Sequence, residues 1–161
     1  MIIYHGGTQI VERPAVLSGS RGRDFGYGFY TTNIREQAEK WAKRQAVSRR
    51  SESAILNIYD FDDVNAKKRL LIKQFADYSL DWLDFVISCR RDGFYRHNFD
   101  IVIGKIANDD VGETVQAVVD GLSSKEFALS RLIYMKANNQ ICFCSEDALS
   151  FLRFTGSERV T

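Results

Sequence analysis

Residues 24–32 of the 161-residue chain read Asp-Phe-Gly-Tyr-Gly-Phe-Tyr-Thr-Thr. The aromatic and β-branched residues favour a strand over 26–32, and the two glycines in it permit close approach of another backbone or of a ligand. Asn33 follows, with Glu36 three residues on, and this spacing predicts a capping box at the start of a helix. The sequence therefore predicts a strand that runs directly into a helix, and the other predicted elements lie on either side of this pair.

Further elements are predicted on both sides of this one. Hydrophobic periodicity and capping signals predict strands over 2–5, 54–61, 99–106 and 140–144, and helices from 34, over 79–91, over 115–122, from 123 and from 145. Strands and helices do not alternate regularly, which is typical of an α+β fold. No repeat and no linker divides the sequence, so we expect a single domain over 1–161.

The charge and the distribution of apolar residues argue against duplex nucleic-acid and membrane partners. The 22 basic and 21 acidic residues leave a net charge of +1, so the overall charge does not favour duplex nucleic acid or an anionic membrane. No stretch approaches the roughly 18 apolar residues of a membrane span, and no basic leader opens the chain. We therefore expect a soluble, unsecreted protein with no membrane partner.

The three cysteines bear on the compartment and on metal binding. Cys89, Cys142 and Cys144 are too few and odd in number for a disulfide framework, which indicates a reducing compartment and, by default, the cytoplasm. Cys142 and Cys144 are two residues apart on a predicted strand and point the same way. Since no partners with zinc-finger spacing accompany them, we interpret them as buried strand thiols and predict no metal.

Three segments place a polar or aromatic group beside glycine or at a strand end. His5 precedes Gly6, and a ring beside an open backbone suits a ligand that carries a ribose hydroxyl and a carboxamide. Tyr30 ends a glycine-bearing strand along which a planar ring can lie, and Gln140 opens a late strand. The first two segments also have a purely structural interpretation: a strand-end histidine bonded to a carbonyl, and a hairpin or a bulge.

Other residues extend these candidates. Arg21 and Arg23 lie just before the glycine-bearing strand and suit a pyrophosphate, although loop arginines are more often solvated. Residues 108–110, Asn-Asp-Asp, could orient a target or act as a base, and a turn explains them as well. Trp41 falls on the apolar stripe of the helix from 34, and its spacing alone favours a core position. No Walker loop and no Gly-x-Gly-x-x-Gly fingerprint is present.

Taken in order, these segments resemble a known class of enzymes. His5-Gly6, then 25–30 running into a helix, then Gln140 resemble the His-Tyr-Glu class of ADP-ribosyltransferases, which includes the poly-ADP-ribose polymerases and diphtheria toxin. More closely, and over nearly the whole chain, the sequence resembles the bacterial family known as domain of unknown function 3990. That resemblance is carried by residues 4–6, 24–32, 37–42, 100–104 and 140–143.

The resemblance implies a fold and a set of roles. The fold is a mixed, mostly antiparallel split sheet with flanking helices, and the co-substrate is NAD. His5 would bind the ribose next to nicotinamide, and the backbone of Gly6 would hold the carboxamide. Tyr30 would pack on one face of the nicotinamide ring and Trp41, eleven residues on, would stack on the other face. Gln140 takes the place of the catalytic glutamate.

Two departures from the class shape the functional expectation. Ala38 aligns with a serine that binds the carboxamide, and the amide of Gln140 offers hydrogen bonds but no full negative charge to an oxocarbenium-like transition state. We therefore expect a mono-ADP-ribosyltransferase, as in the toxin of a toxin-antitoxin pair, that acts on an unidentified protein or nucleic acid and has a cognate antitoxin. The alternative is a non-catalytic NAD-binding or interaction module. A relative that uses NAD to remove a phosphate from RNA fits the near-neutral charge less well.

Overall fold

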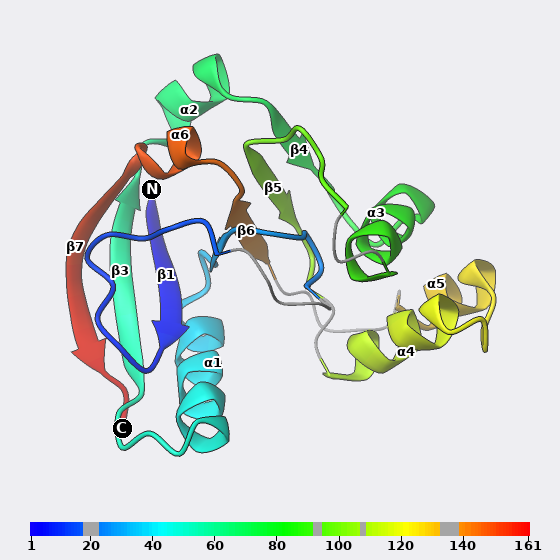
Figure 1. Cartoon of the computed structure of the whole chain (residues 1–161), viewed down its shortest axis with the longest axis horizontal. Coiled ribbons are helices and arrows are strands. Elements are labelled where there is room, and N and C mark those ends of the chain that lie inside the picture. Colours follow the sequence, from blue (N-terminus) through cyan, green and yellow to red (C-terminus); the bar gives the residue numbers. More distant parts are fainter. Residues whose placement is uncertain (18–22, 92–94, 107–108, 133–138) are drawn as a thin grey trace.

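The chain folds into strands and helices that follow one another without regular alternation (Figure 1). The computed structural model describes residues 1–17, 23–91, 95–106, 109–132 and 139–161. In chain order the elements are β1 (Ile2–Gly7), β2 (Phe29–Thr31), α1 (Arg35–Ser48), β3 (Ile55–Phe61), α2 (Asp63–Arg69), β4 (Ile72–Gln74), α3 (Leu80–Arg91), β5 (Ile101–Gly104), α4 (Asp109–Val119), α5 (Lys125–Leu132), β6 (Gln140–Phe143), α6 (Glu146–Leu149) and β7 (Leu152–Arg159).

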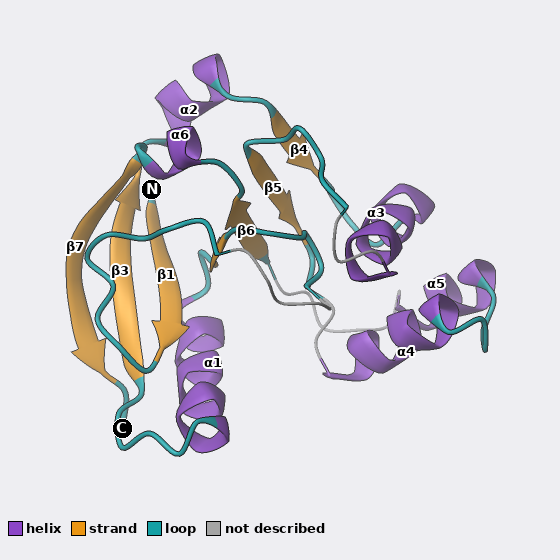
Figure 2. Ribbon diagram, viewed as in Figure 1, coloured by secondary structure: helices purple, strands orange, loops and turns teal. Residues whose placement is uncertain are grey.

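The described strands form two sheets (Figure 2). The first has the order β1-β3-β7 and is antiparallel throughout. The second has the order β2-β6-β5-β4, and only its β4–β5 pair is parallel. An isolated antiparallel bridge between Tyr4 and Thr32 links β1 to the end of β2 and so joins the two sheets. These sheets and helices confirm the predicted α+β class.

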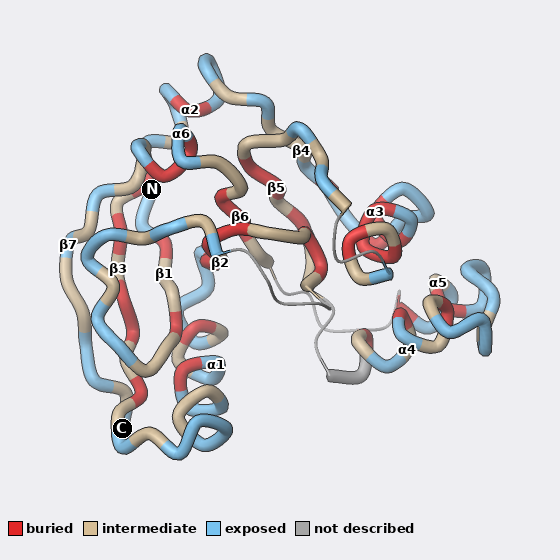
Figure 3. The backbone as a smooth tube through the Cα atoms, in the orientation of Figure 1, coloured by how far each residue is buried: buried red, intermediate tan, exposed pale blue. Residues whose placement is uncertain are grey.

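The central strands β5 and β6 of the second sheet are mostly buried (Figure 3) and supply side chains to two cores. Ile141 and Phe143 of β6 belong to the core that also contains Ile3 of β1 and Tyr59 of β3. Cys142, between them, faces the other core, which α3, α4 and α5 complete. Successive side chains of a strand point to opposite faces, so one short strand contributes to both cores.

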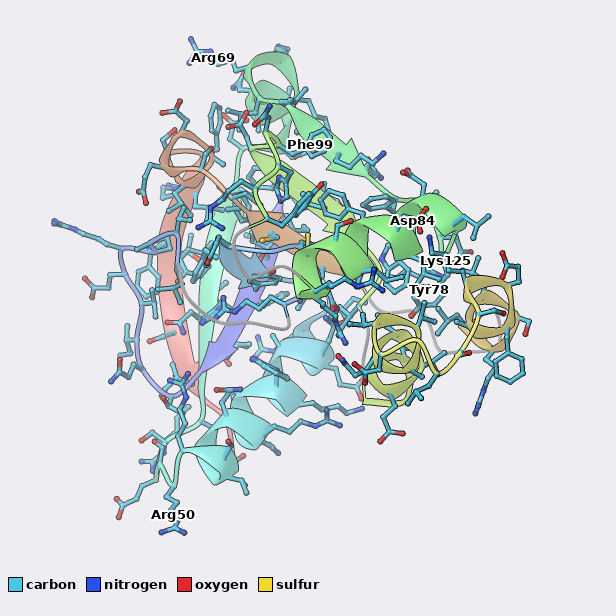
Figure 4. All side chains as sticks on the ribbon, turned by 45° about the vertical axis from the view of Figure 1, so that its right-hand side comes forward. Arg50, Arg69, Tyr78, Asp84, Phe99 and Lys125 are labelled. Atoms are coloured by element: carbon cyan, nitrogen blue, oxygen red, sulfur yellow. The ribbon has the colours of Figure 1, made fainter. Side chains whose placement is uncertain are left out.

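The helices α3 and α5 are tied to each other and to the sheet. The indole Nε1 of Trp82 in α3 donates to the carbonyl oxygen of Lys105, just beyond β5, at 3.1 Å. At the surface, Lys125 of α5 forms an ion pair with Asp84 of α3 at 2.6 Å, and Figure 4 shows the two residues close together. This layer covers the face of the second sheet that points away from the first.

Helix α1 lies directly on β1 at Gly6. A Cβ atom on Gly6 would be 2.9 Å from the backbone nitrogen of Ala42 and closer still to the carbonyl oxygen of Ala38. Ala38 and Ala42 are both buried on the face of α1 that meets the strand. The small residues on the two elements therefore set the distance between helix and strand.

Replacing Gly6 with alanine is expected to lower the free energy of unfolding by about 1 to 3 kcal/mol, because the added methyl group overpacks this contact. Gly156 in β7 is the matched control, since a Cβ atom there meets nothing within 4 Å. Urea titrations of both variants give the comparison. Equal stabilities of Gly6→Ala and Gly156→Ala would contradict the close packing of α1 on β1.

Several local predictions are wrong in detail. The capping box of Asn33 and Glu36 does not form: α1 has Ile34 as its N-cap residue without a side-chain bond, and the hydroxyl of Thr32 accepts from the Ile34 N–H at 3.1 Å instead. The strand predicted over 26–32 begins only at Phe29, because the residues before it turn. The elements α2, β4 and β7 were not predicted. The helix from 145 ends at 149, after which the chain continues into β7.

Candidate functional site

The two sheets part immediately after the bridge between Tyr4 and Thr32, and the side chain of His5 lies at this point. Backbone bonds of 2.8 and 2.9 Å join Tyr4 and Thr32. One residue further along β1, Nδ1 of His5 lies 2.7 Å from the carbonyl oxygen of Tyr30. A carbonyl oxygen only accepts, so Nδ1 carries the proton of this hydrogen bond. In the neutral ring, Nε2 is then left as an acceptor.

The surroundings keep the His5 ring neutral. Burial lowers the pKa of His5 below its usual 6.5, and the positive charges of Arg23 and Arg49 lower it further, against the opposing effect of the hydrogen bond to Tyr30. The ring also packs on Phe29, with 4.5 Å between the ring centroids. At neutral pH, His5 is therefore a fixed, uncharged hydrogen-bond acceptor.

The phenol of Tyr30 is anchored by the loop that precedes β2. Its hydroxyl donates to the carbonyl oxygen of Gly26 at 2.6 Å and accepts from the N–H of Phe25 at 3.2 Å. Gly26 has a φ of 74°, a left-handed conformation that glycine adopts without steric cost. Burial raises the pKa of Tyr30 well above its usual range, so the hydroxyl stays protonated. The ring is thus held in one orientation.

Arg23 and Tyr30 are brought together. The guanidinium of Arg23 lies 5.3 Å from the centroid of the Tyr30 ring, and its Nη1 donates weakly to the carbonyl oxygen of Gly28 at 3.4 Å. A guanidinium over an aromatic face is a cation–π contact. Arg23, one of the two arginines predicted to bind a pyrophosphate, is therefore adjacent to Tyr30, which is predicted to pack on nicotinamide. The other arginine, Arg21, lies outside the described residues.

A buried ion pair fixes the loop that carries these groups. Oδ1 of Asp24 accepts from Nε of Arg90 at 2.8 Å and from Nη2 at 2.6 Å, with side-chain exposures of 7 % and 12 %. Arg90 belongs to α3, so the pair ties the loop to the helical layer. The sequence gives no signal for this contact, because its two residues are 66 positions apart and Arg90 lies in none of the motifs.

Gln140 lies at the start of β6, next to β2. Thr31 pairs with Ile141 and Tyr30 with Cys142, which places Tyr30 and Gln140 on the same face of the sheet. Among the side chains of the described residues, Oε1 of Gln140 is the buried oxygen without a hydrogen-bond partner. Leaving a buried acceptor unpaired costs about 1 to 3 kcal/mol, so this atom is a candidate for binding a ligand donor.

The neighbours of Gln140 hold the start of β6 against α1. The side chain of Gln37 donates to the carbonyl oxygen of Asn139 at 2.8 Å and accepts from its N–H at 3.2 Å. The amide of Asn139 donates to Oδ1 of Asn33 at 2.9 Å. Asn33, predicted as a helix cap, therefore serves to position the residue before Gln140.

Trp41 is on α1, as predicted, but it is not in the core. It is 51 % exposed, whereas Ala38 and Ala42 beside it carry the buried face of the helix. The core position that the spacing of Trp41 favoured is therefore wrong. No ring contact joins Trp41 to Tyr30, both of which are described, so their predicted sandwich around a ligand stays a prediction.

Comparison with known protein families gives a match over nearly the whole chain. A family model described as "Protein of unknown function (DUF3990)" matches residues 1–154. The chain belongs to this family. No curated protein and no solved structure matched it.

In this DUF3990 chain, the remaining predictions have mixed outcomes. Cys142 is a buried strand thiol as expected, whereas Cys144 lies one residue beyond β6 and is only half-buried. Residue 108 falls outside the described residues, and 109–110 begin α4.

Within the described ranges, no three or more His, Cys, Asp or Glu residues are grouped so as to bind a metal ion. No described helix is long and apolar enough to span a bilayer.

Proposed function

We propose that this DUF3990 chain is an NAD-dependent mono-ADP-ribosyltransferase with an ADP-ribosyltransferase-like fold. It would release nicotinamide and transfer ADP-ribose to a protein or nucleic acid that is not identified. One observation carries the proposal: where the two sheets part, β2 and β6 hold the anchored phenol of Tyr30 and the unpaired buried amide oxygen of Gln140 on one face, and the neutral imidazole of His5 on β1 is bonded to the backbone oxygen of Tyr30.

The two acceptors support a ribose as the ligand group. Nε2 of His5 and Oε1 of Gln140 both accept hydrogen bonds, and the ribose next to nicotinamide carries two hydroxyl donors. Since the His5 ring is already held by its bond to Tyr30 and by its packing on Phe29, binding would cost little side-chain entropy at this residue. A ligand hydroxyl would also satisfy the unpaired oxygen of Gln140 and recover the free energy lost by burying it.

The neighbouring groups support the rest of the NAD molecule. The hydroxyl of Tyr30 is bonded at 2.6 Å, so its ring is pre-oriented for stacking on nicotinamide. Arg23 is close enough to this ring that its guanidinium could turn toward a pyrophosphate at the same site. The resemblance assigns the carboxamide to the backbone of Gly6 and the second stacking face to Trp41, which is exposed.

The chemistry requires that the bond between nicotinamide and ribose breaks as positive charge develops on the ribose. The chain would hold the ribose through His5 and Gln140 while the acceptor approaches its anomeric carbon. The amide of Gln140 offers a dipole but no full negative charge to this transition state, so we expect slow, single transfer rather than chain elongation. By the same resemblance we propose a cytoplasmic toxin with a cognate antitoxin as its partner.

Replacing Gln140 with glutamate is expected to raise the rate of nicotinamide release at least about tenfold, because a carboxylate stabilises the developing positive charge. The measurement is nicotinamide release from NAD⁺ at fixed protein concentration. Asn139→Asp, which alters the adjacent residue, is the matched control and should not raise the rate. A Gln140→Glu variant that binds NAD⁺ in calorimetry without turnover would favour the non-catalytic NAD-binding module, for which the neutral amide of Gln140 is the supporting observation.

The test of the proposed function is incubation of the purified protein with labelled NAD⁺ and a bacterial lysate. We expect label on a macromolecule together with free nicotinamide, and a loss of both signals in Tyr30→Ala. Mass spectrometry of the labelled material identifies the acceptor. Absence of label transfer, nicotinamide release and NAD⁺ binding together would contradict the proposal.

A further inference from the structure

Two thiols meet at the end of β6. Cys142 is fully buried within the strand, and Cys144 lies just beyond the strand end, where it is half-buried. Their Sγ atoms are 3.5 Å apart, which is close to van der Waals contact. Two cysteines separated by one residue on extended backbone share a face, and Cys144 is the partly exposed member of the pair.

The surroundings shift the pKa values of the two thiols in opposite directions. The contacts with the Cys142 thiol and with the ring of His97 lower the pKa of Cys144 below its usual range, against the effect of burial. Burial raises the pKa of Cys142 well above its usual range. Cys144 is therefore the more acidic thiol of the pair, and Cys142 stays protonated at neutral pH.

His97 is held against Cys144 by other contacts. Its Nε2 lies 3.1 Å from the carbonyl oxygen of Phe25 and therefore donates to it, and its ring packs on Phe85 with 5.1 Å between the ring centroids. Burial lowers the pKa of His97, but its hydrogen bonds to Cys144 and Phe25 outweigh burial and raise it. A thiolate beside a histidine of raised basicity is the arrangement of reactive rather than inert cysteines.

We propose that Cys144 and Cys142 form a peroxide-reactive dithiol site, with Cys144 as the attacking thiolate and Cys142 as the resolving thiol. The thiolate sulfur of Cys144 attacks a hydroperoxide R–O–O–H. The O–O bond breaks, the sulfur keeps the terminal OH as a sulfenic acid, and the alkoxide leaves as the alcohol after taking a proton from water. The Cys142 sulfur then attacks the sulfenic sulfur, its proton leaves with the hydroxide as water, and a disulfide forms.

This oxidation would act on the loop that carries Tyr30. The Cys142 thiol lies 3.9 Å from the carbonyl oxygen of Tyr27 and within hydrogen-bonding reach of the Tyr30 hydroxyl. A Cβ atom on Gly28 would collide with the same sulfur. Since the disulfide requires the Cys142 sulfur to move toward Cys144, it would withdraw support from residues 25–30. This consequence does not depend on NAD.

The third cysteine provides an internal control. Cys89 in α3 is buried, and burial raises its pKa to about 12. It therefore stays a protonated, shielded thiol at neutral pH and should not react with peroxide or alkylating reagents on the same time scale.

The first experiment treats the reduced full-length protein with iodoacetamide at pH 7 and maps the modified peptides. We expect Cys144 to react at least about 100-fold faster than Cys89, and His97→Gln to slow Cys144 roughly tenfold. This comparison within one protein does not require a folded cysteine variant. Equal rates at Cys144 and Cys89 in the wild type would overturn the proposal.

The second experiment adds hydrogen peroxide and follows intact mass, peptide maps and amide hydrogen exchange. We expect loss of two hydrogen atoms, a Cys142–Cys144 disulfide that dithiothreitol reverses, and faster exchange over 25–30. In Cys142→Ser the reaction should stop at a sulfenic acid that dimedone traps, and Cys89→Ser should behave as the wild type. Oxidation that leaves Cys142 and Cys144 unlinked, or that joins two chains instead, would contradict the dithiol site, whatever the outcome for NAD⁺.

Discussion

Replacing Asp24 with alanine is expected to lower the free energy of unfolding by about 3 to 5 kcal/mol. The substitution leaves the guanidinium of Arg90 charged, only 12 % exposed and without the carboxylate that accepts two of its N–H groups. An uncompensated buried charge costs more than the ion pair contributes, so the effect should exceed that of an ordinary surface change. Urea or thermal unfolding of the variant measures it.

The control for Asp24→Ala is the exposed ion pair between α3 and α5. Asp84 and Lys125 are 53 % and 45 % exposed, so Asp84→Ala should change stability by less than about 1 kcal/mol. Adding Arg90→Met to Asp24→Ala should recover part of the lost stability, because it removes the stranded charge. If Asp24→Ala and Asp84→Ala destabilise equally, the ion pair does not fix the loop before β2.

Replacing His5 with asparagine is expected to lower nicotinamide release at least about 100-fold. The amide nitrogen of the introduced asparagine would occupy the place of Nδ1 and can still donate to the carbonyl oxygen of Tyr30, but the variant has no atom in place of Nε2. The strand contact is therefore kept while the proposed acceptor for the ribose is removed. The readouts are nicotinamide release and, separately, unfolding by urea.

His5→Ala is the companion variant, because it removes both the acceptor and the contact with Tyr30. We expect similar losses of activity in both variants, but a greater loss of stability in His5→Ala. Activity of His5→Asn within a few-fold of the wild type would mean that the imidazole only holds β1 against β2. Equal losses of stability in both variants would show that the asparagine does not preserve the strand contact.

The same acceptor predicts the pH dependence of the reaction. Protonation of Nε2 removes its lone pair, and the pKa of His5 is lowered from 6.5. The neutral form, which the proposed mechanism requires, therefore persists below the pH at which an exposed histidine would be charged. We expect the rate of nicotinamide release to be constant from pH 8 to pH 6.5 and to fall only at lower pH. A fall that begins above pH 6.5 would contradict a buried, neutral His5.

The sequence was sufficient for the elements that carry strong local patterns. Ile55–Phe61 and Leu80–Arg91 lie within one residue of the predicted strand and helix, because the first is a short segment rich in apolar, β-branched and aromatic residues and the second has apolar residues at helical spacing. The order of His5, Tyr30 and Gln140 placed the candidate site on β1, β2 and β6 before their pairing was known. Local pattern thus located these strands, whereas their pairing comes from the structure.

The contacts that complete the site have no local signal. The pair of Asp24 and Arg90 depends on α3 packing beside the loop, and the bond of Asn33 to Asn139 depends on β6 lying beside α1. The strand Leu152–Arg159 was not predicted. None of its residues is fully buried, and its place in the sheet comes from its pairing with β3. Tertiary packing rather than propensity determines each of these features.

The central claim is that His5 accepts a hydrogen bond from NAD⁺, and the most direct measurement is a titration of protein carrying ¹⁵N-labelled histidine. The chain has two histidines, so His97 serves as the reference within the same sample. We predict that NAD⁺ shifts the Nε2 resonance of His5 saturably, as expected for an acceptor, and leaves the resonances of His97 in place. Unchanged His5 resonances at millimolar NAD⁺ would contradict the account.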